Sequence, residues 1–202
     1  MEKRHVIRQD GNVTGKDRER KNNHGSFLVW FTGFSAAGKS TIARLVEKEL
    51  FELGARACVL DGDNLRSGLN ADLGFSREDR TENLRRATEV AKLLVDAGIV
   101  VLAAFISPYR ADRVCARSRF AAGEFVEVYV KCPLRVCEQR DPKGLYRKAR
   151  AGVIKNYTGI SAPYEEPVSH ELVIDTEKTD IVGSVQSVME FLRKRDFPCR
   201  FE

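Results

Sequence analysis

The most informative stretch of the chain is GFSAAGKS, residues 33–40, which has the residue types and spacing of a loop that binds phosphate. It matches G-x-x-x-x-G-K-[ST], a pattern in which glycines let backbone N–H groups approach a polyphosphate. Lys39 is placed to reach the β- and γ-phosphates, and Ser40 can ligate Mg²⁺. The pattern therefore predicts binding of ATP or GTP with Mg²⁺. The predicted nucleotide-binding residues, called the phosphate loop below, are Gly33, Phe34, Ser35, Ala36, Ala37, Gly38, Lys39, Ser40 and Thr41.

Two carboxylates separated by one glycine, Asp61 and Asp63, form a second group that could do chemistry. They end an apolar run, so we expect them at the carboxyl end of a strand, where parallel sheets bind their ligands. Either one could hold Mg²⁺, while the other orients or deprotonates a hydroxyl for in-line attack on the γ-phosphate. The alternative is an ordinary turn, because Asp-Gly is typical of turns.

A third group of residues is suited to binding an anion or a base. Arg80 and Asn83 are three residues apart, so they share one face of a helix. Arginines such as Arg66 and Arg80 are suited to bidentate hydrogen bonds with anionic groups. Phe75, just before that helix, belongs either to the core or to a surface that stacks on a base. A further polar group, Ser107–Arg110, follows the third predicted strand.

Alternating strand and helix patterns predict the elements that hold these residues. Short apolar runs indicate five strands, at residues 26–33, 55–63, 99–107, 124–130 and 171–176. The spacing of apolar residues indicates helices at 39–53, 76–98, 111–120 and 180–194, and Pro133 opens a further short helix. This alternation implies a three-layer α/β fold, in which a parallel five-stranded sheet carries helices on both faces.

Length and charge limit the possible classes of function. The 202 residues suit one domain, which we place at residues 26–202 after a flexible N-terminal arm at 1–25. The net charge is +5, but residues 1–24 hold seven Lys/Arg and four Asp/Glu, so the rest of the chain carries only +2. A nearly neutral body favours a phosphate-rich small molecule over nucleic acid. Because no apolar run could span a bilayer and the first residues lack the apolar region of a secretory signal, we expect a cytoplasmic protein without a membrane partner.

The cysteines do not indicate a cross-linked or zinc-binding protein. There are five of them, an odd number, and none forms a C-x-x-C pair. Cys58 and Cys132 lie in or beside apolar runs. We therefore predict that both are small core residues.

A polar, basic segment at about 141–163, rich in Gly and Pro, is interpreted as a mobile lid. Its cations could stabilise the charge that spreads over phosphoryl oxygens in a transition state, and its closure would exclude water. The alternative is a solvated basic loop. The basic residues in or next to this lid are Arg140, Lys143, Arg147, Lys148 and Lys155.

Four stretches in order resemble the adenylylsulfate kinase (APS kinase) family of P-loop kinases: DGDNLRSGLNADLGFSREDRTENLRR, ISPYR, CEQRDPKGLYRKARAG and KNYTGISAPYEEP. The resemblance runs from about Lys21 to the C-terminus. It implies transfer of the ATP γ-phosphate to the 3′-hydroxyl of adenosine 5′-phosphosulfate, which yields ADP and 3′-phosphoadenosine 5′-phosphosulfate in sulfate assimilation. It also implies Mg²⁺ as cofactor and a homodimer.

The resemblance further implies a role for individual residues. Asp63 would meet the 3′-hydroxyl and Asp61 would lie near the metal with Ser40, while Phe75 and Tyr157 would sandwich the adenine. The implied catalytic set is Asp63, Lys39, Asp61 and Ser107. The implied substrate-binding set is Asp63, Arg66, Phe75, Arg80, Asn83, Ile106, Ser107, Lys155 and Tyr157. We do not expect Ser107 to be phosphorylated, because direct in-line transfer needs no covalent step.

The phosphate loop departs from the family pattern at two positions. Ala36 stands where the family usually has Gly, and a positive φ there would cost roughly 1 kcal/mol or more. Phe34 stands where smaller aliphatic residues are common. Because Gly33 and Gly38 remain, we expect nucleotide binding to persist. Two other readings stay open: a small P-loop kinase for shikimate, gluconate or a nucleoside monophosphate, and a nucleotide-binding regulatory protein with weakened turnover.

Overall fold

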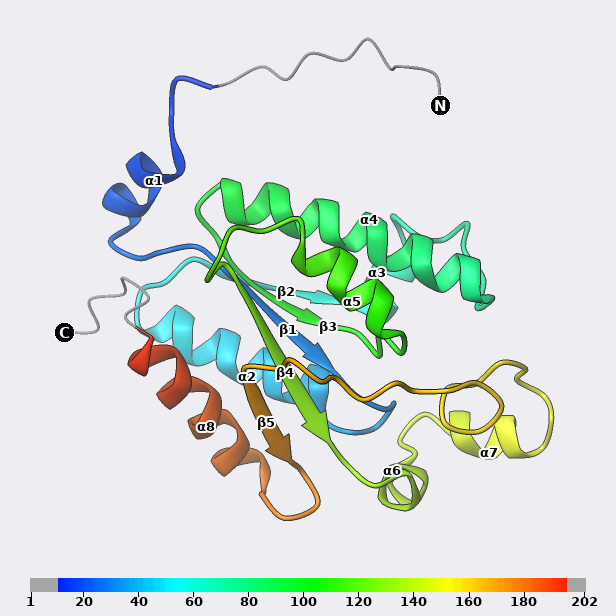
Figure 1. Ribbon diagram of the computed structural model, residues 1–202. Coiled ribbons are helices and arrows are strands. Elements are labelled where there is room, and N and C mark those ends of the chain that lie inside the picture. Colours follow the sequence, from blue (N-terminus) through cyan, green and yellow to red (C-terminus); the bar gives the residue numbers. More distant parts are fainter. Residues whose placement is uncertain (1–10, 196–202) are drawn as a thin grey trace, which may run out of the picture.

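The computed structural model describes residues 11–195, and its centre is a five-stranded parallel sheet (Figure 1). The strands lie side by side in the order β2-β3-β1-β4-β5. Their bounds are β1 Leu28–Thr32, β2 Ala57–Asp61, β3 Val100–Ala104, β4 Phe125–Lys131 and β5 Leu172–Asp175. The predicted parallel sheet of five strands is therefore confirmed.

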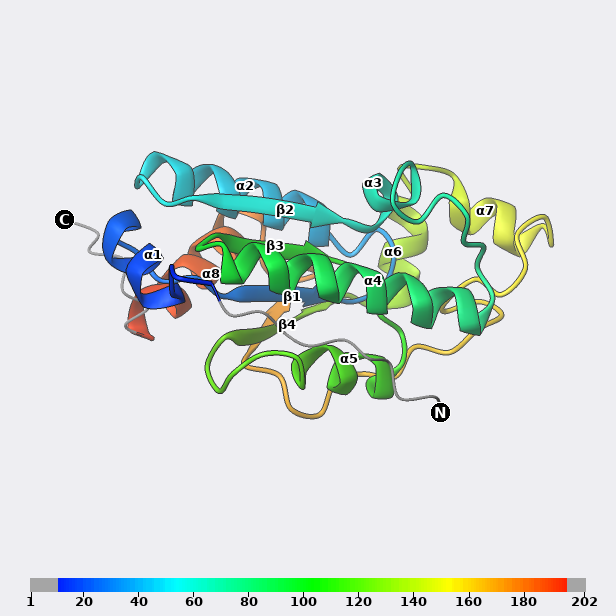
Figure 2. The ribbon, with the colours of Figure 1, turned by 90° about the horizontal axis from the view of Figure 1, so that it is seen from above.

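Helices cover both faces of the sheet, which confirms the three-layer prediction (Figures 1 and 2). Helices α2 and α8 pack on one face, and α4 and α5 pack on the other. The helix bounds are α1 Gly15–Asn22, α2 Lys39–Glu52, α3 Gly62–Arg66, α4 Arg77–Asp96, α5 Arg110–Arg117, α6 Leu134–Arg140, α7 Leu145–Arg150 and α8 Ile181–Lys194. Within residues 11–195, none of the helices combines the length and the apolar character that a membrane span needs.

Strand β1 is buried along its whole length between two apolar layers. Val29 and Phe31 pack in the layer of α2 and α8, whereas Leu28 and Trp30 pack in the layer of α4 and α5. Successive side chains of a strand point to opposite faces, and a parallel strand covered on both faces is apolar throughout. The two layers therefore hold the carboxyl end of β1 firmly at the point where the phosphate loop begins.

The starts of two helices place polar groups at this edge of the sheet. Helix α2 follows Gly38, which has φ +105° and provides no side-chain cap, so the first N–H groups of the helix stay available for a ligand. Helix α4 follows Ser76, whose Oγ accepts a hydrogen bond of 3.1 Å from the Asp79 N–H. This cap holds the first turns of α4, with Arg80 and Asn83, at the carboxyl edge of the sheet.

Part of the predicted N-terminal arm at residues 1–25 has regular structure. Residues 15–22 form helix α1, because the Thr14 and Asp17 side chains and backbones cap its start reciprocally. The Asn22 side chain then donates to the Gly98 carbonyl at 2.9 Å, and the buried His24 Nε2 accepts from the Arg56 N–H at 2.9 Å. Residues 1–10 lie outside the described residues, and the boundary at 25/26 stays a prediction.

Besides α1, two short helices were not predicted. Helix α3 starts at the Asp-Gly pair, because the Asp61 side chain caps it by accepting from the Asp63 N–H at 2.9 Å. Helix α7 lies within the segment interpreted as a lid and begins after Gly144, which has φ +64°. Both helices are too short for an apolar period to be visible in the sequence.

The cysteine predictions are partly confirmed. Cys132 is buried in the core layer of α2 and α8, whereas Cys58 is only half-buried and packs against the layer of α4 and α5. Cys137, for which no prediction was made, is fully buried in the core formed with α2 and α8.

Candidate active site

A cavity of about 1280 Å³ opens at the carboxyl edge of the sheet, between the phosphate loop, the ends of β2 and β3, the lid and the turn after β5. This is where ligands of open parallel sheets are expected. The predicted site residues that line it are Ser35, Ala36, Ala37, Gly38, Lys39, Ser40, Thr41, Asp61, Asp63, Arg66, Phe75, Arg80, Asn83, Ile106, Ser107, Arg140, Lys155 and Tyr157. Gly33, Phe34, Arg147 and Lys148 are not part of this lining. The structure thus brings together residues that lie far apart in the chain, from Ser35 to Tyr157.

Lys39 is the buried cation of the phosphate loop. Its ammonium donates to the Phe34 carbonyl at 2.6 Å, which folds the side chain back over the loop. Burial lowers the pKa of Lys39 to about 8, because the low-dielectric surroundings disfavour the charged form. An anion bound in the loop would offset this penalty, so the site is well suited to phosphate.

The structure gives Gly33 of the phosphate loop a role that the sequence did not indicate. A Cβ on Gly33 (φ +149°) would lie 2.4 Å from the Val130 carbonyl oxygen of β4, so this glycine is needed for packing against a strand. Gly33 also does not line the cavity. Ala36 has φ +60°, so the condition under which strain was expected at this position is met.

Phe34 acts in packing between the phosphate loop and the end of the lid. Its ring centroid lies 4.9 Å from that of Tyr164, and a Cβ on Gly159 would come within 2.9 Å of the Phe34 ring. The family departure at this position therefore falls on the side of the loop that faces away from the cavity. Its physical consequence is an anchor for the segment that follows the lid.

The two carboxylates differ in their surroundings. Asp61 is buried, caps α3, and has Arg44 at 3.5 Å. Asp63 is exposed and forms an ion pair with Lys143 of the lid. The hydrogen bond with Asp63 raises the pKa of Lys143. The interpretation of Asp61 and Asp63 as one ordinary turn is wrong, because Asp61 caps a helix and both line the cavity.

The oxygen donors in the cavity fit Mg²⁺. Ser40 supplies a hydroxyl and Asp61 a carboxylate, which are the hard ligands that this cation prefers. Among residues 11–195 no group of three or more His, Cys, Asp and Glu side chains is arranged as a metal site. A cation here would therefore depend on one or two protein groups together with phosphate oxygens, which is the usual arrangement for Mg²⁺ with nucleotides.

Two arginines, Arg66 and Arg80, lie beside the aromatic ring of Phe75 in the wall of the cavity. Phe75 is 56% exposed, so the core alternative for this residue is wrong. The Arg66 guanidinium lies 4.5 Å from the Phe75 ring centroid and donates to the carbonyls of Leu73 and Gly74. The Arg80 guanidinium lies 5.6 Å from the same centroid. This wall combines positive charge with an open aromatic surface.

The lid is tied to this wall. Arg80 donates to the Asn156 carbonyl at 2.8 Å, so helix α4 holds the second half of the lid. The next residue, Tyr157, is buried, and its ring lies edge-on to Tyr146 of α7 at a centroid distance of 5.1 Å. Phe75 and Tyr157 both line the cavity, as a base-binding pair must. Burial lowers the pKa of Arg80, a cost that an anion in the cavity would offset.

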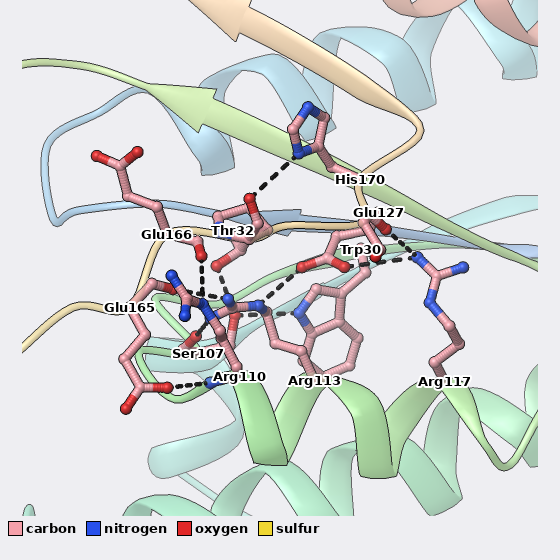
Figure 3. A network of polar contacts seen from close by, with 12 residues as sticks. Trp30, Thr32, Ser107, Arg110, Arg113, Arg117, Glu127, Glu165, Glu166 and His170 are labelled. Carbon is pink, nitrogen blue, oxygen red and sulfur yellow. Dashed lines mark hydrogen bonds and ion pairs between the residues drawn. The ribbon is translucent and has the colours of Figure 1, made fainter.

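Ser107 lines the cavity and belongs to a buried polar network (Figure 3). It has φ +42°, a conformation that is strained for serine. Its hydroxyl accepts from the Trp30 indole N–H at 3.1 Å and donates to the Thr32 hydroxyl at 2.8 Å. Thr32 in turn donates to the Ile106 carbonyl at 2.8 Å. Because the proton of the Ser107 hydroxyl is already used, the arrangement favours a positioning role over attack on phosphate.

Arg113 fastens this network to the segment after the lid (Figure 3). Its guanidinium donates to the carbonyls of Ser107 and Glu165, both at 2.6 Å, and pairs with Glu127 at 2.8 Å. Sequence reasoning missed this group. The signal was available, because Glu127 is a charge in the middle of the apolar run FVEVYV, residues 125–130, and a buried charge needs a partner.

The turn after β5 is a second part of the site that sequence reasoning missed. Thr176 lines the cavity, accepts from Arg140 at 3.2 Å and donates to the Ala37 carbonyl at 2.9 Å. It therefore links a basic residue next to the lid with the phosphate loop. The signal was its position as the last residue of the fifth predicted strand, at the same edge as the other clusters.

Comparisons with known proteins agree with this geometry. The family model described as adenylylsulphate kinase matches residues 25–175. An adenylyl-sulfate kinase of Geotalea daltonii is 58% identical over 183 residues, which cover 91% of this chain and 90% of the relative. One of Oceanobacillus iheyensis is 55% identical over 192 residues, which cover 95% and 96%.

Among solved structures, the APS kinase of Mycobacterium tuberculosis in complex with AMPPNP and APS superposes with a TM-score of 0.80. It is 51% identical, and the match covers 84% of this chain and 98% of that one. The family model, the curated relatives and the solved structure agree with the sequence motifs and with the cavity that unites them. This chain belongs to the adenylylsulphate kinase family.

Proposed function

We propose that this chain transfers the γ-phosphate of ATP to the 3′-hydroxyl of adenosine 5′-phosphosulfate, producing ADP and 3′-phosphoadenosine 5′-phosphosulfate in sulfate assimilation. The observation that carries the proposal is that one cavity contains both the phosphate loop with Lys39 and, across it, Asp63 with an arginine-lined aromatic wall. A relative that is 51% identical holds AMPPNP and APS together. Donor and acceptor of the reaction would thus share one space.

At the donor end, Lys39 would exchange the Phe34 carbonyl for phosphate oxygens of ATP. This exchange would offset the burial penalty on the charged ammonium and place it where negative charge develops in phosphoryl transfer. The uncapped start of α2 after Gly38 offers further backbone N–H donors to the phosphates. These groups bind and orient the phosphoryl group that moves.

At the acceptor end, Asp63 would accept the proton of the 3′-hydroxyl as that oxygen attacks the γ-phosphorus. The new P–O bond forms in line with the bond to ADP that breaks. Asp63 must first leave its ion pair with Lys143, which frees a lid cation next to the reacting phosphate. Arg66, Arg80 and Asn83 would hold the phosphosulfate and ribose. Phe75 and Tyr157 would hold the adenine.

The remaining groups support this step. Mg²⁺ held by Ser40 and Asp61 would supply charge neutralisation for the ATP phosphates when bound. Arg140, Lys143 and Lys155, which line the cavity from in or next to the lid, would add positive charge and help to exclude water. Arg147 and Lys148 of α7 would act only with a change in lid position. Ile106 and Ser107 would shape the acceptor pocket through the buried network.

The proposal extends to the setting of the enzyme. The family resemblance supports a homodimer in the cytoplasm that binds small molecules and has no nucleic acid or membrane as partner. Size measurement in solution by light scattering tests the dimer, and a monomeric mass would refute it.

The activity is tested by mixing the purified chain with MgATP and adenosine 5′-phosphosulfate and identifying the nucleotide products. Shikimate, gluconate and AMP serve as parallel acceptors. We expect ADP and a 3′-phosphorylated product, with kcat reduced about 10²- to 10⁴-fold in Asp63→Asn. Asp96→Asn, which removes an exposed carboxylate at the end of α4, is the matched control and should keep wild-type turnover. ATP binding without phosphorylation of any acceptor would instead favour the hypothesis of a nucleotide-binding regulatory protein with weakened turnover.

A further inference from the structure

We infer that Asn70, which does not line the cavity, is a positioning residue that orients the amide of Asn83 so that its NH2 group faces the acceptor. The inference rests on the proposed function, since it concerns the binding of adenosine 5′-phosphosulfate. Asn70 is fully buried, in the turn between α3 and α4, and Asn83 is buried on α4. Only Asn83 borders the cavity.

A hydrogen bond joins the two side chains. The Asn70 Nδ2 donates to the Asn83 Oδ1 at 3.0 Å and lies 3.5 Å from the Asn83 main-chain carbonyl. A main-chain carbonyl can only accept, so it favours the orientation in which Asn70 presents its NH2 group to both oxygens. The side-chain oxygen of Asn83 is thereby committed to Asn70.

The other end of the Asn83 amide is left for a ligand. Its Nδ2 is not among the buried polar atoms without a partner, and no hydrogen bond from it to another described residue is formed. It is therefore accessible, and the accessible space beside Asn83 is the cavity. An NH2 group is the half of an amide that binds an anion or a hydroxyl oxygen, whereas the oxygen half would repel an anion.

The arrangement carries a cost that a purely structural role does not explain. The Oδ1 of Asn70 is buried and has no partner within residues 11–195. Buried polar groups are nearly always hydrogen-bonded, so an acceptor left alone needs a reason. Here the reason is the orientation of the Asn70 amide. Its NH2 group must face Asn83, and its oxygen therefore points the other way, where it finds no partner. The turn itself is held by main-chain bonds, such as that from the Asn70 N–H to the Leu65 carbonyl at 2.8 Å.

The test is a double-mutant cycle of Asn70→Ala and Asn83→Ala, with binding of adenosine 5′-phosphosulfate and of an ATP analogue measured separately. We expect Asn70→Ala to raise the Kd for the acceptor about 10-fold, which is the scale of one hydrogen bond to a charged group. The Kd for the ATP analogue should change by less than about twofold. In the Asn83→Ala background the effect of Asn70→Ala should vanish. An equal effect in both backgrounds, or equal loss of both ligands, would overturn the inference.

Two further variants sharpen the result. Asp72→Ala removes the 2.7 Å contact with Arg86 that holds the same turn, and it should leave the acceptor Kd within about twofold. Asn83→Asp keeps an oxygen for Asn70 but turns the cavity-facing NH2 group into a carboxylate oxygen. It should weaken acceptor binding more than about 10-fold. Unchanged binding in Asn83→Asp would refute the orientation even if Asn70→Ala does not fold.

The hydrogen bond between Asn70 and Asn83 can be tested without any ligand. Unfolding of the four proteins of the cycle in urea should show coupling between positions 70 and 83. Coupling in stability together with failure to bind the acceptor would refute the proposed function alone. Absence of coupling would refute the present inference whatever the acceptor proves to be.

Discussion

The guanidinium of Arg113 lies 2.8 Å from the carboxylate of Glu127, and both side chains are buried. The same guanidinium holds the Ser107 carbonyl and the Glu165 carbonyl (Figure 3). One buried cation therefore joins strand β4, the loop after β3 and the segment after the lid. It stabilises the strained backbone of Ser107 at the wall of the cavity.

Removing the cation should destabilise the fold strongly. Arg113→Met would leave the buried Glu127 with Arg117, at 3.4 Å, as its remaining ion-pair partner among residues 11–195, and we expect a loss of about 3–5 kcal/mol in the free energy of unfolding. Urea unfolding followed by circular dichroism measures it. Arg119→Met, which breaks an exposed pair with Glu89, should cost less than about 1 kcal/mol. Similar costs for the two variants would contradict this account.

Relieving the strain in the phosphate loop should stabilise the protein slightly. Ala36 has φ +60°, which costs an L-residue about 1–2 kcal/mol, whereas glycine adopts it freely. Ala36→Gly also gains entropy in the unfolded chain, so we expect a net gain of at most about 1 kcal/mol. The control is Ala37→Gly, because Ala37 is buried and has no positive φ, so this variant should lose stability. The melting temperatures of the two variants and the wild type measure the difference. Equal destabilisation by both would show that Ala36 is not strained.

The depressed pKa of Lys39 should appear in the pH dependence of stability. The pKa of Lys39 in the folded protein is about 8, against 10.5 for a lysine in water. Between these two pH values the unfolded chain binds more protons at this residue, so stability should rise with pH across the window. The slope should approach about 1.4 kcal/mol per pH unit and be missing from Lys39→Met. Parallel curves for the two proteins in urea unfolding at pH 8 to 10.5 would refute the shift.

The same group should couple ATP binding to proton uptake. Phosphate oxygens next to Lys39 favour its charged form, so its pKa should rise when ATP binds. Near pH 9 the complex should take up close to one proton. Calorimetry in two buffers with different enthalpies of ionisation measures this number. A value near zero would mean that Lys39 does not meet the phosphates.

Gly33 should be intolerant of a side chain for a reason unrelated to nucleotide. A Cβ there would lie 2.4 Å from the Val130 carbonyl oxygen, which belongs to a strand that cannot move aside. We expect Gly33→Ala to lose more than about 3 kcal/mol of stability even without ligand. Gly15→Ala is the control and should be nearly neutral, because its φ is not positive and its Cβ would meet no described atom within 4 Å beyond its chain neighbours and its own helix backbone. A normal melting temperature for Gly33→Ala would contradict the packing argument.

Much of the site could be predicted because its residues follow strand ends. Once strands and helices alternate, the carboxyl ends of parallel strands must share one edge, and Lys39, Asp61 and Ser107 come with them. Thr176 obeys the same rule and could have been included. Helix α1 was missed because it is polar on all sides and depends on a cap at Thr14 and on contacts with distant residues.

The sequence by itself determined the parallel sheet, the phosphate loop, the pair of carboxylates and the family. These features depend on the local spacing of residue types, which the sequence states directly. Only the tertiary structure decided that Gly33 serves strand β4, that the Ser107 hydroxyl is engaged and that Lys143 meets Asp63. The physical reason is that such contacts join residues far apart in the chain, 80 positions in the last case, and burial and backbone geometry select them.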